Sequence, residues 1–417
     1  MLTALLIAGF ALATDQAVQR PTVKETVATL EALFEADRFG ADLSGFDARL
    51  AELEAVEIAT PAEQKDWTQR LAKIAGKERK LEKKRGTYHW FEAEKRGLFI
   101  VGGETSRPKG LLIAFHGGGA GSGDATTAQS AFSSAASKLD WLMICPEVLE
   151  KTARGWTDSG TEEFVVQLVE AAMRTWKIDF DRVYFSGHSM GGYGTWTLGA
   201  HHADRVAALA PSAGAPTPLT GPTGIDDIVP GVVPNLRNVK IAIYQSDDDP
   251  RVPPIANRVA AQKLDEAQKR WGGFEHEYWE VPNRQHELPP GGMEALLEKI
   301  KSAKRDARPT RIVWQPSLAW KRQFYWLWWS KPVAGTTLVA DVDRKTNVIV
   351  ITAGADPKGL EVLLDERLVD MQREVVVKLG QREVYRGIPR ADLGTLAKTS
   401  LSGDPDLTFA VRVKVSP

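Results

Sequence analysis

A serine stands between two glycines in the stretch FSGHSMGGYG, residues 185–194. In a Gly-x-Ser-x-Gly pattern, Ser189 could be a nucleophile on a sharp turn, where bulky side chains at 187 and 191 would collide. The pattern fixes only three positions, and a chain of this length contains it by accident with a chance of roughly one in ten. A structural turn serine is therefore the alternative, and the flanking sequence has to decide.

A serine hydroxyl needs a base and an acid that orients this base. The stretch VKIAIYQSDDDPRVPP, residues 239–254, is an expected strand that ends in three aspartates, Asp247, Asp248 and Asp249. The next expected strand, FEHEYWEV, is followed by a loop that contains His286. The chain order Ser, Asp, His at successive strand ends predicts that His286 takes the proton of Ser189 and that an aspartate holds the tautomer of His286.

A developing oxyanion also needs hydrogen-bond donors. The stretch LLIAFHGGGAGSGD places Gly117 and Gly118 directly after a strand, where backbone N–H groups can approach a substrate closely. A second donor is expected from the backbone N–H of Met190, the residue after the serine. We expect His116 to be structural and to hold this turn.

Strands and helices must alternate to position these residues. Expected strands are GLLIAFH, WLMICPE, DRVYFSG, VAALAPS, VKIAIYQ and FEHEYWEV, preceded by a pair around residues 87–103. Expected helices lie near 125–138, 161–176, 191–201, 254–270 and 291–304. This alternation predicts an α/β fold over residues 86–305, with a mostly parallel sheet and helices on both faces. Ser189 then lies on a strand–turn–helix corner.

The two flanking regions have different patterns. Residues 22–85 contain apolar residues at helical spacing, which predicts a helical N-terminal segment of three helices, the last one basic from Lys77 to Arg85. Residues 311–417 hold short β-type runs separated by Gly, Asp-Pro and Asn turns, which predicts an all-β, sandwich-like domain.

The central region resembles the α/β-hydrolase superfamily. The resemblance is carried by HGGG (116–119), IDFDRVYFSGHSMGG (178–192), ADRVAALAPSAG (203–214), SDDDPRVPP (246–254) and NRQHE (283–287). It is closest to secreted bacterial feruloyl and acetylxylan esterases and polyhydroxybutyrate depolymerases, with a fainter likeness to prolyl oligopeptidase catalytic domains. It implies a serine hydrolase of carboxylic esters without a cofactor. The family's acid precedes a Pro-x-Val-Pro stretch, which implies Asp249 rather than Asp247 or Asp248.

Two other functions stay open at this stage. A serine peptidase of the prolyl oligopeptidase type would need a propeller or another gate, for which the helical N-terminal segment is too short. A non-catalytic binding protein on the same fold would be favoured by a missing catalytic residue, and Ser189, Asp249 and His286 are all present. The substrate and the oligomeric state are not determined by these patterns.

Several residues allow two interpretations. Trp156 lies in a loop at the catalytic end of the sheet, so it either lines the substrate pocket or packs. Residues 213–236 are rich in Pro and Gly and form either a partial lid or an ordinary loop. The aromatic run at 324–329 could stack on sugars, but both of its faces are apolar, which favours packing. The remaining histidines are expected to be surface or strand residues: His89, His201, His202 and His276.

Composition excludes several classes of protein. The 417 residues carry 53 Lys and Arg against 54 Asp and Glu, so nothing indicates a nucleic-acid partner. The only cysteine, Cys145, lies in an apolar run, and no metal-binding cluster is apparent. The first residues, MLTALLIAGFALATDQ, are too short an apolar run to span a bilayer. The small-x-small pattern before Thr14 predicts a signal peptide over residues 1–13 and a secreted or periplasmic protein; a buried helix is the alternative.

Overall fold

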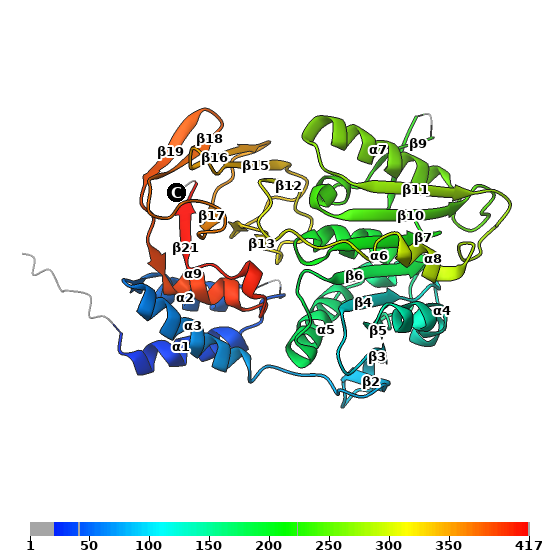
Figure 1. The fold of residues 1–417 in the computed structure, drawn as a ribbon, viewed down its shortest axis with the longest axis horizontal. Helices are drawn as coiled ribbons and strands as arrows, with labels where there is room; N and C mark the ends of the chain where they lie inside the picture. The colour runs from blue at the N-terminus through cyan, green and yellow to red at the C-terminus, as the bar shows by residue number, and fades with distance from the viewer. Residues whose placement is uncertain (1–20, 41, 223, 416–417) are drawn as a thin grey trace, which may run out of the picture.

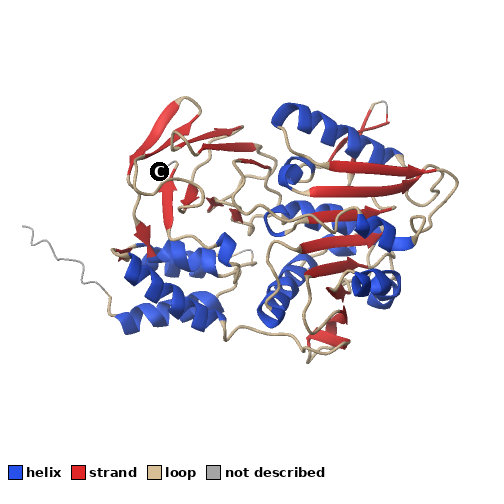
Figure 2. Ribbon diagram, viewed as in Figure 1, coloured by secondary structure: helices blue, strands red, loops and turns tan. Residues whose placement is uncertain are grey.

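The computed structural model describes residues 21–40, 42–222 and 224–415. The predicted signal peptide over residues 1–13 lies outside this part of the chain. The described residues form two lobes, an α/β lobe built on one large sheet and a second lobe that joins both ends of the chain (Figure 1). Figure 2 shows that helices flank the large sheet, whereas the second lobe has its helices on one side and its strands on the other.

The large sheet has eight strands in the order β11-β10-β7-β6-β4-β5-β3-β2. The six neighbouring strands from β11 to β5 are parallel. Strand β3 pairs antiparallel with both β5 and β2. The strands are β2 (Gly86–Phe91), β3 (Arg96–Gly103), β4 (Gly110–Phe115), β5 (Trp141–Pro146), β6 (Val183–His188), β7 (Ala208–Ser212), β10 (Lys240–Ser246) and β11 (His276–Val281).

Successive side chains of a strand point to opposite faces of the sheet, and in these strands both sets are apolar. Helices therefore cover both faces of the sheet. On β4, Ile113 belongs to one apolar cluster and Leu112 to the other. The first cluster contains α5 (Thr161–Trp176), α6 (Met190–His201) and α7 (Ile255–Trp271), and the second contains α4 (Ala125–Lys138) and α8 (Gly292–Glu298). This is the α/β-hydrolase fold, so the predicted fold class is confirmed; only α8 is shorter than expected.

The second lobe brings together the two ends of the chain. Helices α1 (Val23–Glu35), α2 (Ser44–Glu54) and α3 (Pro61–Ala75) lie beside the C-terminal strands and away from the large sheet (Figure 1). Strand β1 (Glu57–Ile58) pairs antiparallel with β20 (Ala391–Asp392). The N-terminal helices therefore complete the C-terminal domain, although more than 200 residues of chain separate them.

Two sheets pack together in this lobe. One has the order β1-β20-β21-β17-β14-β13 and the other β12-β15-β16-β18-β19. Trp314 of β12 stacks on Phe324 of β13 with ring centroids 5.4 Å apart, so aromatic side chains fill the space between the sheets. The C-terminal strands are β12 (Arg311–Trp314), β13 (Gln323–Phe324), β14 (Leu327–Trp329), β15 (Leu338–Asp343), β16 (Val348–Ala353), β17 (Leu360–Leu364), β18 (Val375–Leu379), β19 (Arg382–Gly387) and β21 (Val411–Lys414).

Two expectations for these regions need correction. The C-terminal region is not all-β, because α9 (Leu393–Ser400) follows β20 and packs on α2. The third helix does not extend into the basic run, because it ends at Ala75, capped by Gly76. Beyond this point, Leu81 is buried and its N–H donates to Thr175 Oγ1 of α5 at 2.8 Å. The run from Lys77 to Arg85 thus forms the connection between the lobes.

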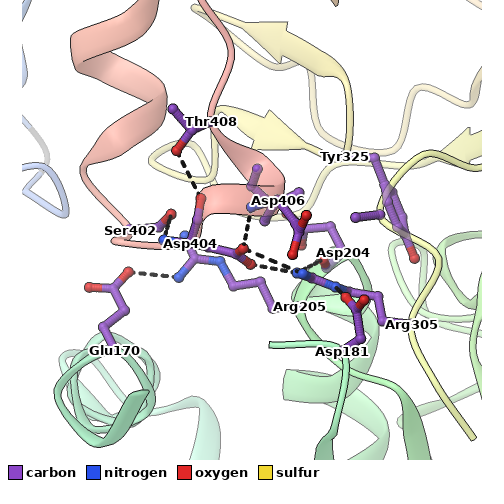
Figure 3. Close-up of polar contacts among 12 residues, drawn as sticks. Glu170, Asp181, Asp204, Arg205, Arg305, Tyr325, Ser402, Asp404, Asp406 and Thr408 are labelled. Carbon is purple, nitrogen blue, oxygen red and sulfur yellow. Dashed lines mark hydrogen bonds and ion pairs between the residues drawn. The ribbon is translucent and has the colours of Figure 1, made fainter. Parts of the chain in front are cut away.

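Buried polar contacts join the two lobes. Lys321 Nζ lies 2.7 Å from the Asp204 carboxylate, and both side chains are at most 7% exposed. Arg305 donates to Asp404 at 2.6 Å, and Tyr325 donates its hydroxyl to the carbonyl of Ala203 at 2.8 Å. Figure 3 shows Asp204, Tyr325 and Asp404, which come from both lobes, around Arg305. Breaking one partner of such a buried pair is strongly destabilising, so this interface is a fixed part of the fold.

The aromatic run at 324–329 lies in the interior. All six of its side chains are buried, and Trp328 is the most exposed of them at 6%. Trp326 Nε1 donates to the carbonyl of Pro309, and Trp329 Nε1 donates to the carbonyl of Lys358. These rings have no free face for a sugar, so the packing interpretation is confirmed and the glycan-stacking interpretation is wrong.

Candidate active site

Ser189 lies on a strained turn between β6 and α6. Its backbone has φ +61° and ψ −125°, a conformation that is rare for a residue with a side chain. A Cβ atom at Gly187 would lie 2.4 Å from the carbonyl oxygen of Gly191. A Cβ atom at Gly191 would lie 2.2 Å from the carbonyl oxygen of Phe115. Both glycines are therefore a steric requirement of this sharp strand–turn–helix corner, which has the geometry of a nucleophile elbow.

A chain of hydrogen bonds leads from this serine to a buried carboxylate. Ser189 Oγ lies 2.8 Å from His286 Nε2, and His286 Nδ1 lies 2.7 Å from Asp249 Oδ2. The Asp249 side chain is 0% exposed, whereas that of His286 is 12% exposed. The structure thus brings together the three residues that the sequence predicted, from loops at the carboxyl ends of β6, β10 and β11.

The Asp249 carboxylate is held by the turn that follows it. Its Oδ1 accepts hydrogen bonds from the backbone N–H groups of Arg251 and Val252, each at 2.9 Å. These bonds leave Oδ2 for His286. A carboxylate that accepts from Nδ1–H fixes the tautomer in which Nε2 can accept a proton from the serine. The DPRVP stretch therefore has a structural role, because its amides orient the acid.

The two neighbouring aspartates hold the histidine loop. Asp248 Oδ1 accepts from the backbone N–H of Gln285 at 2.7 Å, and Asp247 Oδ1 accepts from that of Asn283 at 3.0 Å. Asn283 and Gln285 both have positive φ, at 57° and 49°. The strained loop that carries His286 is thus tied to the end of β10. Sequence reasoning considered these two aspartates only as alternative acids and missed this role.

The glycine loop after β4 passes directly beside the serine. A Cβ atom at Gly117 would lie 3.0 Å from the carbonyl oxygen of His188 and 3.3 Å from Ser189 Cβ. Gly118 has φ +145°, and a Cβ there would lie 2.5 Å from the carbonyl oxygen of Ser122. Met190 is the first residue of α6, and the first N–H groups of a helix have no partner within it. Gly117 and Met190 therefore lie directly beside the serine, and the role of the Gly117, Gly118 and Met190 N–H groups as oxyanion donors stays a prediction.

His116 holds the glycine loop in place. It is 0% exposed, its Nδ1 lies 2.7 Å from the carbonyl oxygen of Gly117, and its Nε2 accepts from the N–H of Val148 at 3.2 Å. Burial lowers its pKa, so the ring is neutral, with the proton on Nδ1. This arrangement agrees with the structural role expected for His116.

Trp156 does not line a substrate pocket. Its side chain is 0% exposed, packs edge-on against Phe115 at 4.7 Å, and donates Nε1–H to the carbonyl of His116 at 3.2 Å. A Cβ at Gly194 of α6 would lie 2.6 Å from its ring. The assignment to substrate binding is therefore wrong. The loop reaches the catalytic end of the sheet, but the Trp156 ring points into the core. There it contacts Phe115 and the carbonyl of His116 at the start of the glycine loop.

His188 is a further residue beside the triad. Its ring centroid lies 4.9 Å from that of His286, and its Nδ1 lies 2.9 Å from Ser212 Oγ. Burial, followed by the nearby imidazole of His286, lowers the pKa of His188 to about 4. The ring is thus neutral at pH 7 and adds no charge beside His286. In the sequence, only the position of His188 within GHSMG indicated that it would lie beside these residues.

Residues 213–236 begin next to the serine. A Cβ at Gly214 would lie 2.1 Å from the carbonyl oxygen of Ser189. The segment then forms a hairpin of β8 (Pro218–Gly221) and β9 (Gly224–Ile228), whose second strand packs on α7. The structure shows one position of this hairpin, so its role as a partial lid stays a prediction.

No group of three metal-ligating side chains occurs within the described ranges. Cys145 is buried, and burial raises the pKa of its thiol, so it is not a nucleophile. No described helix is long and apolar enough to cross a membrane. Two histidines expected to be surface or strand residues are instead buried at the end of α6: His201 Nδ1 and His202 Nε2 lie 2.8 Å and 3.0 Å from the same Glu162 oxygen.

No protein-family model and no curated protein matches the chain. Among solved structures, it is similar to a thermostable esterase at 18% identity and a TM-score of 0.40, over 53% of this chain and 63% of that one. It is similar to the CE1 ferulic acid esterase of the anaerobic fungus Anaeromyces mucronatus at 17% identity and a TM-score of 0.37, over 53% and 89%. A proposed dipeptidyl aminopeptidase IV of Bacteroides ovatus shares 15% identity, with a TM-score of 0.39 over 52% and 34%. Similarities this low concern the fold of about half of the chain and do not carry over a reaction.

Proposed function

We propose that the chain is a serine hydrolase that cleaves carboxylic esters through an acyl-enzyme intermediate. The observation that carries this proposal is the hydrogen-bonded chain from Ser189 through His286 to Asp249, on a turn whose strain lifts the serine oxygen clear of the sheet. A structural turn serine has no need of both partners or of a positive φ. The same three residues also argue against a binding protein that has lost its catalytic function.

Each described contact has a role in the proposed reaction. Ser189 Oγ attacks the ester carbonyl carbon while His286 Nε2 takes its proton, and the Asp249 carboxylate stabilises the resulting imidazolium. The N–H of Met190 and that of Gly117 or Gly118 stabilise the oxyanion. His286 then returns the proton to the leaving alcohol, which leaves an acyl group on Ser189. Water, deprotonated by His286, releases the acid and restores the serine.

The choice of substrate is part of the proposal. Ser189 and His286 are partly exposed, so an ester bond attached to a larger molecule can reach them. Acyl or feruloyl esters linked to a polysaccharide fit this exposure and the resemblance of the sequence. A secreted or periplasmic protein would meet such substrates, and this localisation rests on the cleavage pattern of residues 1–13 alone.

Labelling with a fluorophosphonate probe tests the nucleophile directly. We expect one adduct, located by mass spectrometry on Ser189. Ser189→Ala should lose the adduct and about 10⁴- to 10⁶-fold of the hydrolysis of a p-nitrophenyl ester, with an unchanged circular dichroism spectrum. Ser186→Ala is the matched control, because Ser186 Oγ only donates to the carbonyl of Ala210 on the same strand pair.

A substrate panel separates the alternatives. It contains p-nitrophenyl acetate and butyrate, a feruloyl ester, acetylated xylan and p-nitroanilide peptides. Hydrolysis of the peptides in preference to every ester would make the chain a peptidase. An enzyme that neither labels nor turns over any of these substrates would favour a non-catalytic binding protein.

A further inference from the structure

Gln245 is a buried polar residue of β10 beside the candidate acid, and the proposed reaction leaves it without a role. It is 0% exposed. Its Nε2 donates to the carbonyl of Val252 at 3.0 Å, to that of Ser246 at 3.2 Å and to Asp249 Oδ2 at 3.4 Å. Gln245 therefore contacts the acid itself and the backbone on both sides of it.

A second buried amide fixes the orientation of this glutamine. Asn257, in the first turn of α7, is also 0% exposed, and its Nδ2 donates to Gln245 Oε1 at 2.7 Å. If the Gln245 amide were turned over, its oxygen would face two carbonyls and a carboxylate, none of which can donate. Only one orientation is therefore satisfied, and it directs the N–H groups toward Asp249 and its turn.

The glutamine completes the set of donors around the acid. An ionised carboxylate has about four acceptor positions. On Asp249, Oδ1 accepts from the N–H groups of Arg251 and Val252. Oδ2 accepts from His286 Nδ1 at 2.7 Å and from Gln245. The Asp249 side chain is 0% exposed, so solvent does not replace a donor that is lost.

The same amide pair extends to the segment beside the serine. Asn257 Nδ2 also lies 3.5 Å from the carbonyl oxygen of Gly214. A Cβ at Gly214 would lie 2.1 Å from the carbonyl oxygen of Ser189, so these two backbones are in close contact. Gln245 and Asn257 thus connect the turn of the acid with the backbone that packs on the turn of the nucleophile.

We propose that Gln245, oriented by Asn257, is a positioning residue for the candidate acid. It holds Asp249 Oδ2 where His286 Nδ1 can donate to it, and the imidazole then keeps the tautomer that accepts the serine proton. Without this donor, a buried carboxylate would lack one partner and would turn to recover it, away from His286. The inference rests on the proposed function, since it concerns the geometry of that reaction.

A near-isosteric variant tests this role. Gln245→Met keeps an unbranched side chain of similar length and removes the donor. We expect kcat for a p-nitrophenyl ester to fall by about 10- to 100-fold, with less than about a twofold change in KM, because the acid is displaced and the substrate site is not.

Asn347→Leu is the matched control. Asn347 is 0% exposed as well, and it donates to the carbonyls of Asp370 and Glu374 in the second lobe. The loss of this buried amide should lower the melting temperature and leave kcat unchanged. An equal loss of kcat in both variants would assign the effect of Gln245→Met to stability and overturn the proposal.

The pH dependence of a conservative variant tests the hydrogen bond itself. Two carboxyl groups in one buried site do not readily both ionise, so the carboxyl group of Gln245→Glu keeps a proton that it can donate to Asp249. Its kcat relative to the unmutated enzyme should fall by about tenfold between pH 6 and pH 9, as this proton is lost. The relative kcat of Gln245→Met should be the same at both pH values. A constant ratio for Gln245→Glu would remove the role of the donor.

Proton NMR of the full-length chain gives a readout that needs no turnover. The proton between His286 Nδ1 and Asp249 should give a low-field resonance, assigned by its loss in Asp249→Asn. This resonance should shift or disappear in Gln245→Met and stay unchanged in Asn347→Leu. A shifted resonance in a chain that cleaves no ester would overturn the proposed reaction but support the placement of Asp249 by Gln245. Ester cleavage with an unchanged kcat in Gln245→Met would overturn this inference alone.

Asn257→Leu decides if Gln245→Met does not fold. This variant leaves Gln245 Oε1 without its donor, so the amide is held less firmly and kcat should fall by about fivefold, the effect of one hydrogen bond. The low-field resonance of His286 should shift in the same variant. An unchanged kcat together with an unchanged resonance would show that the amide pair does not position the acid.

Discussion

Asp248 accepts a hydrogen bond from the backbone N–H of Gln285 at 2.7 Å, one residue before His286. The same oxygen accepts from Ser246 Oγ at 2.6 Å, and Ser246 Oγ in turn accepts from the N–H of Arg284 at 3.0 Å. The aspartate next to the candidate acid therefore acts on the loop of the candidate base. Three consecutive aspartates thus have separate structural roles.

The first prediction separates these roles. Asp249→Asn should lower kcat by about 10⁴-fold, because an amide favours the wrong tautomer of His286. Asp248→Asn should have little effect, since an amide oxygen can still accept from Gln285. Asp248→Ala removes this acceptor and should lower kcat by about 10- to 100-fold through displacement of His286, with a smaller change in KM. Steady-state kinetics on a p-nitrophenyl ester measure all three, and equal kcat for Asp249→Asn and the unmutated enzyme would assign the acid to another residue.

The second prediction concerns Gly191, the second glycine of the elbow. Gly191→Ala should abolish activity and lower the melting temperature, because its Cβ would lie 2.2 Å from the backbone carbonyl oxygen of Phe115. Neither backbone segment can move without displacing Ser189 or the glycine loop. Gly354→Ala is the control, since the atoms nearest to its Cβ would lie at 3.7 Å or more. An active Gly191→Ala enzyme would contradict the described packing of the elbow.

The third prediction concerns stability in acid. Burial lowers the pKa of His188 and of His202 to about 4 in the folded chain, from 6.5. Between pH 6.5 and pH 4, the unfolded chain therefore binds more protons than the folded chain. As a result, the free energy of unfolding falls as the pH falls through this range. The stabilisation is fully present above pH 6.5. Each histidine should account for a loss of about 2 kcal/mol between pH 7 and pH 5.

Urea unfolding at both pH values measures this loss. In His188→Asn, an amide can keep the hydrogen bond with Ser212, but the titrating group is gone, so the loss between pH 7 and pH 5 should be smaller. His89→Asn is the control, because His89 is a partly exposed residue of β2. This variant should retain the full loss of unfolding free energy between pH 7 and pH 5. An unchanged pH dependence in His188→Asn would show that folding does not lower the pKa of this ring.

The fourth prediction concerns the two ends of the chain. Removal of residues 311–417 should cause aggregation or a lower melting temperature, because it exposes the surface of the α/β lobe that Lys321 and Tyr325 contact. Removal of residues 21–75 should have the same effect, because these helices form one lobe with the C-terminal sheets. Size-exclusion chromatography and melting curves test both deletions. A truncated chain that is monomeric and equally stable would show that the lobes fold independently.

The C-terminal region should also fail to bind polysaccharide. Pull-down of the full-length chain on xylan and cellulose, with Ser189→Ala to prevent turnover, measures this directly. The reason is the burial of the aromatic run at 324–329, which leaves no ring face for stacking. Tight binding would require a surface other than this run.

The sequence by itself determined the α/β fold class and the residues that can form the triad. Apolar strands and amphipathic helices alternate regularly, and both patterns are local, so the sheet was predictable. The steric role of the glycines at 187 and 191 was also predictable, because the turn that requires them lies within five residues of sequence. The order of Ser189, Asp249 and His286 along the chain follows from parallel strands, whose carboxyl ends lie along one edge.

Only the tertiary structure decided how side chains from distant segments meet. Whether Trp156 faces a substrate or the core depends on the glycine loop and α6, which lie about 40 residues away on either side. The burial of His201 and His202 depends on Glu162 in another helix. The buried ion pair between Lys321 and Asp204 likewise forms only when the two lobes meet. Such contacts carry no periodic signal in the sequence, because they arise when separately folded elements pack together.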